Sequence, residues 1–141
     1  MITTNKYEED ALPLLEELTT YGFKYSKDFE GNSPTSISFV YLKNNFALEF
    51  YFNVRDQLFL CLVSEVKIEQ LSGRNNEGYN NDLSRYLIEH HSFKGDPNSL
   101  SYWFAGSKTK TVSAVINECL SSIKNHAKFL LDDDFHLEIK K

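Results

Sequence analysis

The sequence predicts an α+β fold, in which an antiparallel β-meander of four to five strands packs against an N-terminal helix and a long C-terminal helix. Large apolar residues alternate with polar ones from Phe23 to Ile68, as in strands with one buried face. Apolar residues also recur at helical spacing from Val112 to Leu130. The 141 residues, 41% of them hydrophobic, suit a single domain over residues 1–141 with one continuous core.

The N-terminal helix is expected between Asp10 and Gly22. Proline is tolerated only near the start of a helix, so Pro13 places the start close to Asp10. A glycine such as Gly22 is a typical helix stop. One face of this segment carries three leucines, Leu14, Leu15 and Leu18. Glu16 and Glu17 should therefore face water.

Three strands are expected next. The first alternates from Phe23 to Glu30 and has one polar face, which suits a sheet edge. A turn at 31–34 leads into the second strand, Thr35 to Leu42. Asn44 and Asn45 can form a two-residue hairpin turn, because asparagine tolerates the positive φ that such a turn requires. The hairpin then pairs large apolar residues on one face: Tyr41 with Leu48, Phe39 with Phe50 and Ile37 with Phe52.

The fourth strand is apolar on both faces, so it should be interior to the sheet or covered on both sides. Its register depends on the turn around Arg55 and Asp56, because a shift of one residue exchanges the two faces. A two-residue loop would direct one set inward, Phe59, Cys61 and Val63. A three-residue loop would direct the other set inward, Leu58, Leu60 and Leu62. We expect the leucines to form the core set.

The remaining chain is expected to hold a polar loop at 69–81, a short helix from about Asp82 to His90, a loop at 92–106 and the final helix. The final helix should begin at a Ser107 cap. It should bury one stripe: Val112, Val115, Ile116, Cys119, Leu120, Ile123, Ala127 and Leu130. Cys61 and Cys119 are interpreted as small buried hydrophobic residues and not as a disulfide. An additional edge strand over 135–139 is left open.

The charge distribution favours a protein partner. Fifteen basic residues against twenty acidic ones give a net charge of −5, which disfavours nucleic acid because no stripe of Lys and Arg is present to neutralise phosphates. Residues 1–33 alone carry three lysines and seven carboxylates, so most of the negative charge lies there. A basic protein partner suits this balance. The chain shows no signal-peptide pattern and no apolar run of membrane-spanning length, so we expect a cytoplasmic protein without membrane contact.

Motifs for metal or cofactor binding are missing from the sequence. It contains no glycine-rich phosphate loop, no C-x-x-C, no H-E-x-x-H and no acidic calcium loop. We therefore expect no cofactor, no metal and no enzymatic activity. The acidic run from Asp132 to Asp134 is interpreted as a solvated helix exit.

Isolated ionisable residues have ordinary structural explanations. His90 and His91 would point about 100° apart on a helix, so they do not converge on one ion. His90 continues the apolar face of the short helix, which predicts one packed and one exposed histidine. Glu49 and Glu65 are expected at solvent-facing strand positions. A nuclease that uses His91 or His126 is a possible alternative, although the spacing does not support it.

The loop before the final helix contains consecutive aromatic residues, Tyr102, Trp103 and Phe104. Three adjacent aromatic side chains cannot all point inward if the segment is extended. Tyr102 or Trp103 would then be exposed and available as a protein-binding anchor. The alternative is a loop that tucks its aromatic side chains under the sheet.

In size, acidity and order of elements, the chain resembles the small acidic immunity proteins of bacterial contact-dependent growth-inhibition toxin systems. The resemblance is one of overall profile, without a diagnostic motif. It implies an inhibitor that binds the C-terminal domain of a toxin, often a nuclease with a basic cleft, as a monomer in a one-to-one complex. The residues we expect to contact this partner are Glu77, Tyr79, Asp82, Asp96, Tyr102 and Trp103.

Two other functions remain open at this point. A secretion chaperone resembles this chain in size and acidity, and would be expected to form a homodimer and to place a helix between its third and fourth strands. A small hydrolase or nuclease would require a pocket that holds a histidine beside a carboxylate.

Overall fold

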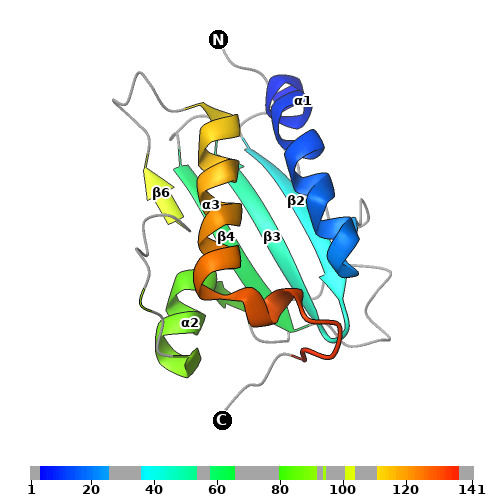
Figure 1. The fold of residues 1–141 in the computed structure, drawn as a ribbon. Helices are drawn as coiled ribbons and strands as arrows, with labels where there is room; N and C mark the ends of the chain where they lie inside the picture. Colours follow the sequence, from blue (N-terminus) through cyan, green and yellow to red (C-terminus); the bar gives the residue numbers. More distant parts are fainter. Residues whose placement is uncertain are drawn as a thin grey trace.

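The computed structural model describes residues 4–25, 36–53, 58–65, 80–91, 94, 101–103 and 111–136. The chain forms, in order, α1 (Thr4–Leu15), η1 (Glu16–Tyr21), β1 (Lys24–Tyr25), β2 (Ser36–Lys43), β3 (Phe46–Asn53), β4 (Leu58–Glu65), β5 (Asn80–Asp82), α2 (Leu83–His91), β6 (Ser101–Trp103), α3 (Val112–His126) and η5 (Lys128–Leu131). In Figure 1, α1 and α3 lie side by side over one face of an antiparallel sheet. The predicted α+β class is confirmed, with one helix near each end of the chain.

The sheet has the strand order β1-β2-β3-β4-β5, and β6 also pairs with β4. All of these pairings are antiparallel. β5 and β6 share one edge of β4, since β5 pairs with Leu62–Ser64 and β6 with Leu58–Leu60. β4 is therefore interior, as predicted. The prediction of loops at 80–81 and 101–103 is wrong, because pairing with β4 turns both short segments into strands.

The hairpin of β2 and β3 has the predicted register. Tyr41 pairs with Leu48, and the same register holds along both strands for the pairs Phe39–Phe50 and Ile37–Phe52. Asn44 has φ of 53°, the left-handed conformation expected in the turn. All six residues of these three pairs are buried under the helices.

The predicted inward face of β4 is wrong. Phe59, Cys61 and Val63 are fully buried among the helix-facing residues, whereas the leucines at 58, 60 and 62 are partly exposed on the other face. Asn53 pairs with Leu58, so four residues separate the two strands. Side chains alternate between the two faces, so a four-residue connection directs the same residues inward as a two-residue loop would. The rings of Phe52 and Phe59 lie 4.9 Å apart, which continues the aromatic layer from β3 into β4.

The N-terminal helix differs from its predicted bounds. It begins at Thr4 and not near Asp10, so Pro13 lies inside it, three residues before the α-helix gives way to η1. Proline cannot donate a backbone hydrogen bond and crowds the preceding turn, so a change of helix type near this residue is expected. Gly22 ends η1 with φ of 90°, which confirms the predicted stop.

The C-terminal helix starts later than predicted. α3 is capped by Thr111, whose Oγ1 accepts a hydrogen bond from the Ala114 amide at 3.1 Å, while the predicted cap Ser107 lies outside the described residues. A threonine immediately before the first helical residue can accept this bond, which a residue five positions away cannot. The predicted stripe is confirmed as buried: Val112, Val115, Ile116, Cys119, Leu120, Ile123, Ala127 and Leu130.

One core fills the space between the helices and the sheet. It combines leucines of α1 and η1, the aromatic face of β2–β4, and the buried stripe of α3. Cys61 and Cys119 belong to this core as free thiols, as predicted. Within the described ranges, no helix is both long and apolar enough to cross a membrane. Phe135 and His136 are not in a strand, and the rest of the possible strand over 135–139 lies outside the described residues.

Candidate binding groove between the N-terminal helix and the sheet edge

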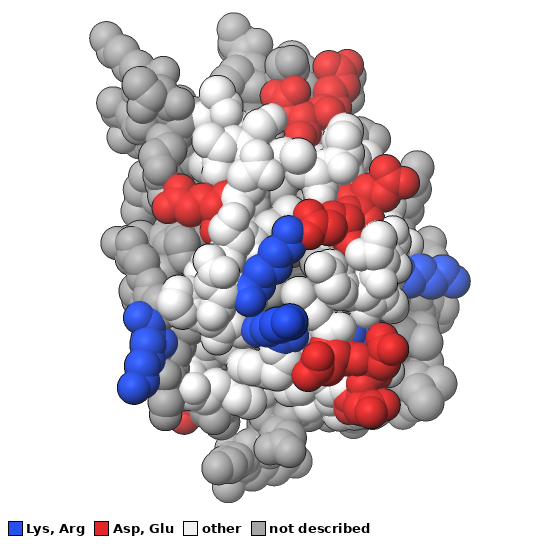
Figure 2. All heavy atoms as spheres, viewed as in Figure 1, with Lys and Arg blue, Asp and Glu red and all other residues white. Residues whose placement is uncertain are grey.

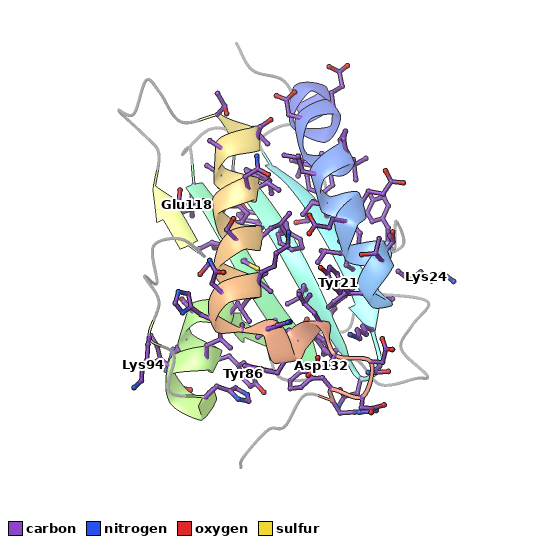
Figure 3. All side chains as sticks on the ribbon, viewed as in Figure 1. Tyr21, Lys24, Tyr86, Lys94, Glu118 and Asp132 are labelled. Carbon is purple, nitrogen blue, oxygen red and sulfur yellow. The ribbon has the colours of Figure 1, made fainter. Side chains whose placement is uncertain are left out.

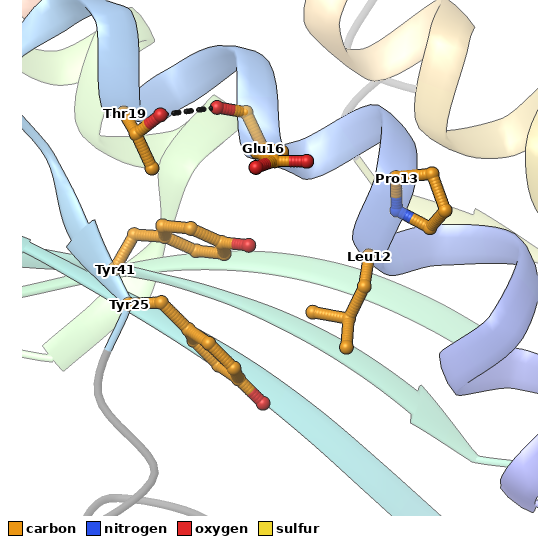
Figure 4. Close-up of a pocket in the computed structure, with 6 residues that line it drawn as sticks. All are labelled: Leu12, Pro13, Glu16, Thr19, Tyr25 and Tyr41. Carbon is orange, nitrogen blue, oxygen red and sulfur yellow. Dashed lines mark hydrogen bonds between the residues drawn. The ribbon is translucent and has the colours of Figure 1, made fainter.

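A groove of about 380 Å³ lies between the N-terminal helical segment and the β1 end of the sheet. Its lining residues are Leu12, Pro13, Glu16, Thr19, Tyr25 and Tyr41. In Figure 4, the two tyrosine side chains project from the sheet beneath Glu16, and Leu12 and Pro13 form the wall beside them. The groove therefore combines aromatic rings and an aliphatic wall with one carboxylate.

The local fold explains how these side chains come together. η1 continues the helical segment from Glu16 to Tyr21, and the Thr19 hydroxyl donates to the Glu16 carbonyl at 2.7 Å. The amide of Gly22 then donates to the Thr19 carbonyl at 3.3 Å, and the chain turns directly into β1. Pairing of β1 with β2 places Tyr25 opposite Tyr41, so both rings face the helical segment.

The two tyrosine rings form a stacked pair. Their centroids lie 5.2 Å apart with an angle of 25° between the planes. Tyr41 is only 2% exposed and belongs to the core, whereas Tyr25 is half-buried. Tyr41 is thus the buried floor of the groove, and Tyr25, which stacks against it, is the ring that reaches toward solvent.

Glu16 sets the electrostatics of the groove. Burial, with the nearby Glu16 carboxylate as a second cause, raises the pKa of Tyr41 to about 12. The adjacent Glu17 points elsewhere and forms an ion pair with Lys124 of α3, and this partner raises the pKa of Lys124. No lysine or arginine is among the described residues that line the groove. The neighbouring carboxylates therefore differ in their surroundings: Glu16 lines the groove, and Glu17 pairs with Lys124.

Figure 2 shows the wider charge pattern on this face of the molecule. Acidic side chains gather along α1 and η1 and again over the segment that follows η5, with basic side chains over α3 and η5 between them. Asp132, Asp133 and Asp134 are exposed, as predicted for a solvated helix exit. The acidic character of the N-terminal helical segment is thus displayed at the surface.

The tip of the β2–β3 hairpin forms a second charged site, which we call the hairpin junction: Phe23, Lys43, Asn44, Leu130 and Asp133. Lys43 is 5% exposed, and its Nζ donates to the Leu130 carbonyl at 3.3 Å and lies 5.1 Å from the centre of the Phe23 ring. Burial lowers the pKa of Lys43, while the charges of Asp133 and Asp132 act in the opposite direction. Asn44 Nδ2 donates to the carbonyls of Asp133 at 3.0 Å and Phe135 at 2.6 Å. The junction therefore fastens the chain after η5 to the sheet.

Glu49 does not face solvent, so that prediction is wrong. Its side chain is 5% exposed and accepts a hydrogen bond of 2.8 Å from the Ser38 hydroxyl. Both residues belong to the sheet face opposite the helices, where Val40 and Ala47 are buried as well. Glu49 is therefore buried on this face of the sheet. The hydrogen bond from the Ser38 hydroxyl offsets part of the free-energy cost of burying its carboxylate. The side chain of Glu65 lies outside the description.

The structure shows His91 as a packed histidine, while the sequence predicts this role for His90. The Nε2 of His91 lies 3.0 Å from the Tyr86 hydroxyl, and its ring stacks on Phe129 at 4.2 Å. The side chain of His90 is not described, and His126 is exposed near the end of α3. Figure 3 places Tyr86 of α2 and Asp132 at the same end of the molecule. These contacts give His91 a packing role between α2 and η5.

The structure brings together some of the residues predicted to contact a partner. Glu77, Tyr79 and Asp96 lie outside the described residues, and only the backbone of the other three is described. Asp82 pairs with Leu62, Tyr102 with Phe59 and Trp103 with Leu58, so all three lie along one edge of β4. The groove lies at the other end of the strand order.

Sequence reasoning missed the groove itself. The sequence predicts only that Glu16 faces solvent and that Tyr25 and Tyr41 occupy ordinary strand positions. The signals present in the sequence are Pro13, three residues before the Glu16 carboxylate, and the single tyrosine of the edge strand, Tyr25. Their meaning depends on the distance between helix and strand, which sequence patterns do not specify.

Within the described ranges, no group of three or more His, Cys, Asp or Glu side chains is arranged to hold a metal ion. No protein-family model matches the chain, and neither a curated protein nor a solved structure is significantly similar to it.

Proposed function

We propose that this protein is an immunity protein that binds a cognate bacterial toxin domain and blocks its active site. It would act in the cytoplasm, as a monomer in a one-to-one complex and without catalysis of its own. The observation that carries the proposal is the groove that the Glu16 carboxylate lines together with Tyr25 and Tyr41. All of its lining residues except Tyr41 belong to the segment 1–33, which holds −4 of the chain's net charge of −5.

This combination suits a basic partner. A nuclease toxin binds phosphates through a positively charged cleft, and carboxylates at the surface of an inhibitor can occupy the same positions. Complementary charge raises the rate of association through electrostatic steering. An aromatic anchor in a well-formed groove then lowers the rate of dissociation. Glu16 and Tyr25 provide these two elements at one place.

The strand connectivity weighs against the secretion chaperone. β3 and β4 are adjacent antiparallel neighbours, and only four residues separate the paired Asn53 and Leu58. A helix between the third and fourth strands, which that function would require, does not fit into this interval. A sizing experiment that finds a homodimer would nevertheless favour the chaperone.

The hydrolase alternative requires a histidine near a carboxylate in a pocket. The groove holds the Glu16 carboxylate, but none of its described lining residues is a histidine. The His91 ring is engaged with Tyr86 and Phe129, as described above. No specific observation therefore favours this function over protein binding.

The proposal is tested by co-expression with the product of the gene immediately upstream, carrying an inactivating substitution. The tagged protein is purified, its partners are identified by mass spectrometry, and the complex is sized. We expect a tight one-to-one complex with a basic toxin domain. Recovery of the protein alone, as a monomer, would contradict the proposal.

A growth experiment provides the functional control. Cells that express the active toxin domain should survive only when this protein is also present. Protection should disappear when Glu16 is replaced by lysine, because charge reversal at the groove repels a basic partner. Glu17→Lys is the matched control, since it changes the same charge at a residue that faces Lys124.

A further inference from the structure

The Tyr41 hydroxyl is a buried polar group without a hydrogen-bond partner among the described residues. The Tyr41 ring is packed, with centroid distances of 5.2 Å to Tyr25 and 6.1 Å to Phe50, and the residue is only 2% exposed. Buried hydroxyls are rarely left unpaired, because an unmade hydrogen bond costs free energy. In Figure 4, the hydroxyl points along the groove toward the wall of Leu12 and Pro13. A molecule that enters the groove can therefore supply the missing partner.

This hydroxyl acts as a donor at neutral pH. Burial, with the Glu16 carboxylate as the second cause, raises the pKa of Tyr41 to about 12, so the phenol keeps its proton. Glu16 is near enough to influence the phenol, but no hydrogen bond joins these two described side chains. The Tyr41 hydroxyl therefore requires an acceptor that the groove receives from outside.

Glu16 presents an acceptor in the same groove. It is exposed, and none of the described residues pairs with its carboxylate through a hydrogen bond or an ion pair. Thr19, which also lines the groove, donates its hydroxyl proton to the Glu16 carbonyl at 2.7 Å. Leu12 and Pro13 form an aliphatic wall. The groove thus offers one donor and one acceptor beside an apolar surface.

The donor and the acceptor select the polar group that fits between them. An ammonium group has donors alone, so it leaves the Tyr41 proton without an acceptor, and a ketone has acceptors alone, so it leaves Glu16 without a donor. A hydroxyl group has both on a single atom, which must then suit two partners from different elements. A primary carboxamide carries its oxygen and its N–H groups on separate atoms at one end, so each can meet its own partner. Its apolar stem can pack against the aliphatic wall.

We propose that the groove binds a primary carboxamide, the side chain of a glutamine or asparagine of the protein partner, whose oxygen accepts from the Tyr41 hydroxyl and whose N–H donates to the Glu16 carboxylate. This inference rests on the proposed function, because the toxin domain would supply the side chain. It separates two tasks in that function. The acidic charge of the N-terminal segment attracts a basic partner, and the groove recognises one neutral side chain. Tyr25 stays stacked on Tyr41 throughout and supports its ring.

The inference is tested with small molecules that share an apolar stem and differ in the polar group. The full chain, labelled with ¹⁵N, is titrated at neutral pH with butyramide, methyl propyl ketone, butylammonium and butanol. We expect saturable shifts of amides in η1, β1 and β2 with butyramide, at the millimolar affinities that ligands of this size reach. Affinities for the other three should be about fivefold to tenfold weaker, because each leaves one hydrogen bond unmade or misaligned.

Variants of the protein locate the two hydrogen bonds. Tyr41→Phe keeps the packed ring and removes the donor, so it should weaken butyramide binding about tenfold. Its thermal stability should not fall, because no described residue uses the hydroxyl. Glu16→Ala should also weaken butyramide binding about tenfold, yet leave the affinity for methyl propyl ketone unchanged, since the ketone donates nothing to Glu16. Glu17→Ala is the matched control and should leave butyramide binding unchanged, because Glu17 pairs with Lys124.

Several results would overturn the inference. Equal or tighter binding of butylammonium would show a cation site, and equal binding of the ketone or butanol would show a groove without selectivity for an amide. The absence of saturable shifts would show that the groove takes only water. Unchanged butyramide binding in Tyr41→Phe, or a loss of stability in this variant, would show that the hydroxyl is not available to a ligand.

The titrations do not involve the toxin, so their failure is separate from failure of the proposed function. With the toxin domain, Tyr41→Phe should weaken the complex about tenfold while the variant remains folded by circular dichroism. A toxin complex that is unaffected by Tyr41→Phe would retain the proposed function and reject this contact.

Discussion

The groove and the hairpin junction are built from the same kinds of groups but serve different ends. In the junction, the Lys43 ammonium lies over Phe23 near Asp133, so the cation, ring and carboxylate all belong to the chain. In the groove, Tyr25 and Glu16 supply only the ring and the carboxylate. The difference teaches that similar groups can hold the chain together in one region, the junction, and line a surface groove in the other, where we propose that the partner binds.

Charge reversal should give the largest difference in stability between the hairpin junction and the groove. Lys43→Glu would place a buried carboxylate beside Asp132 and Asp133, and loss of a buried cation typically costs about 3–5 kcal/mol. Glu16→Lys changes an exposed position and should alter stability by less than about 0.5 kcal/mol. Urea denaturation followed by circular dichroism measures both. Similar losses of stability in the two variants would remove the distinction between junction and groove.

Asn44 tests how much the hairpin tip contributes to the junction. Asn44→Ala removes both hydrogen bonds to the C-terminal segment and puts alanine in a left-handed conformation that it tolerates less well than asparagine, so we expect a loss of about 2–3 kcal/mol. Asn44→Gly removes the same hydrogen bonds but tolerates φ of 53°, so a loss of about 1 kcal/mol is expected. Equal effects in urea denaturation would show that the backbone conformation is not strained.

Much of the fold was predictable because it depends on local pattern. The β2–β3 register follows from the alternation around Asn44, and the buried stripe of α3 follows from helical spacing. The inward face of β4 was not predictable, because both faces are apolar and the choice depends on the parity of the loop before Leu58. The strands β5 and β6 are three residues long, too short for a pattern, and exist through pairing with β4.

The functional site was less predictable than the fold. Glu49 is buried because the second face of the sheet is covered, and the alternation of a strand does not reveal what covers it. The groove requires Glu16 to come close to Tyr41, which depends on how the helical segment ends and turns at Gly22. Such distances arise from tertiary packing, so sequence patterns identified the residues only as ordinary surface and strand positions.

The pH dependence of stability gives a smaller, specific test of the groove. The pKa of Tyr41 is about 12 in the folded chain, compared with 10.0 for an ordinary tyrosine. Between these values the folded protein holds a proton that the unfolded chain has released, so this contribution is complete below pH 10 and is lost as the pH rises through 12. Absorbance at the tyrosinate band should show a late-titrating component that Tyr41→Phe removes.

Glu16→Gln should shift this titration downward, since the carboxylate is the second cause of the raised pKa. Burial is the larger cause, so the pKa should remain above the ordinary value in the variant. Glu17→Gln should leave the titration of Tyr41 unchanged. An equal shift in both variants would contradict the placement of Glu16 over the aromatic floor.

The smallest expected effect concerns the ion pair that distinguishes the two glutamates. Glu17→Gln breaks the surface ion pair with Lys124, and such pairs contribute less than about 1 kcal/mol to stability. Because salt screens exposed charges, the loss of stability should be smaller still at high ionic strength. Thermal unfolding at low and high ionic strength measures this effect. A large, salt-independent loss would show that Glu17 is part of the packed structure.

The most direct test of the account is the affinity of the inactivated toxin domain for three forms of this protein, measured by isothermal titration calorimetry. We expect Glu16→Gln to weaken the complex about tenfold and Glu17→Gln to leave it unchanged, because only Glu16 faces the groove. Equal affinities for the unmodified protein and both variants would contradict the claim that the groove provides the anchor for its partner.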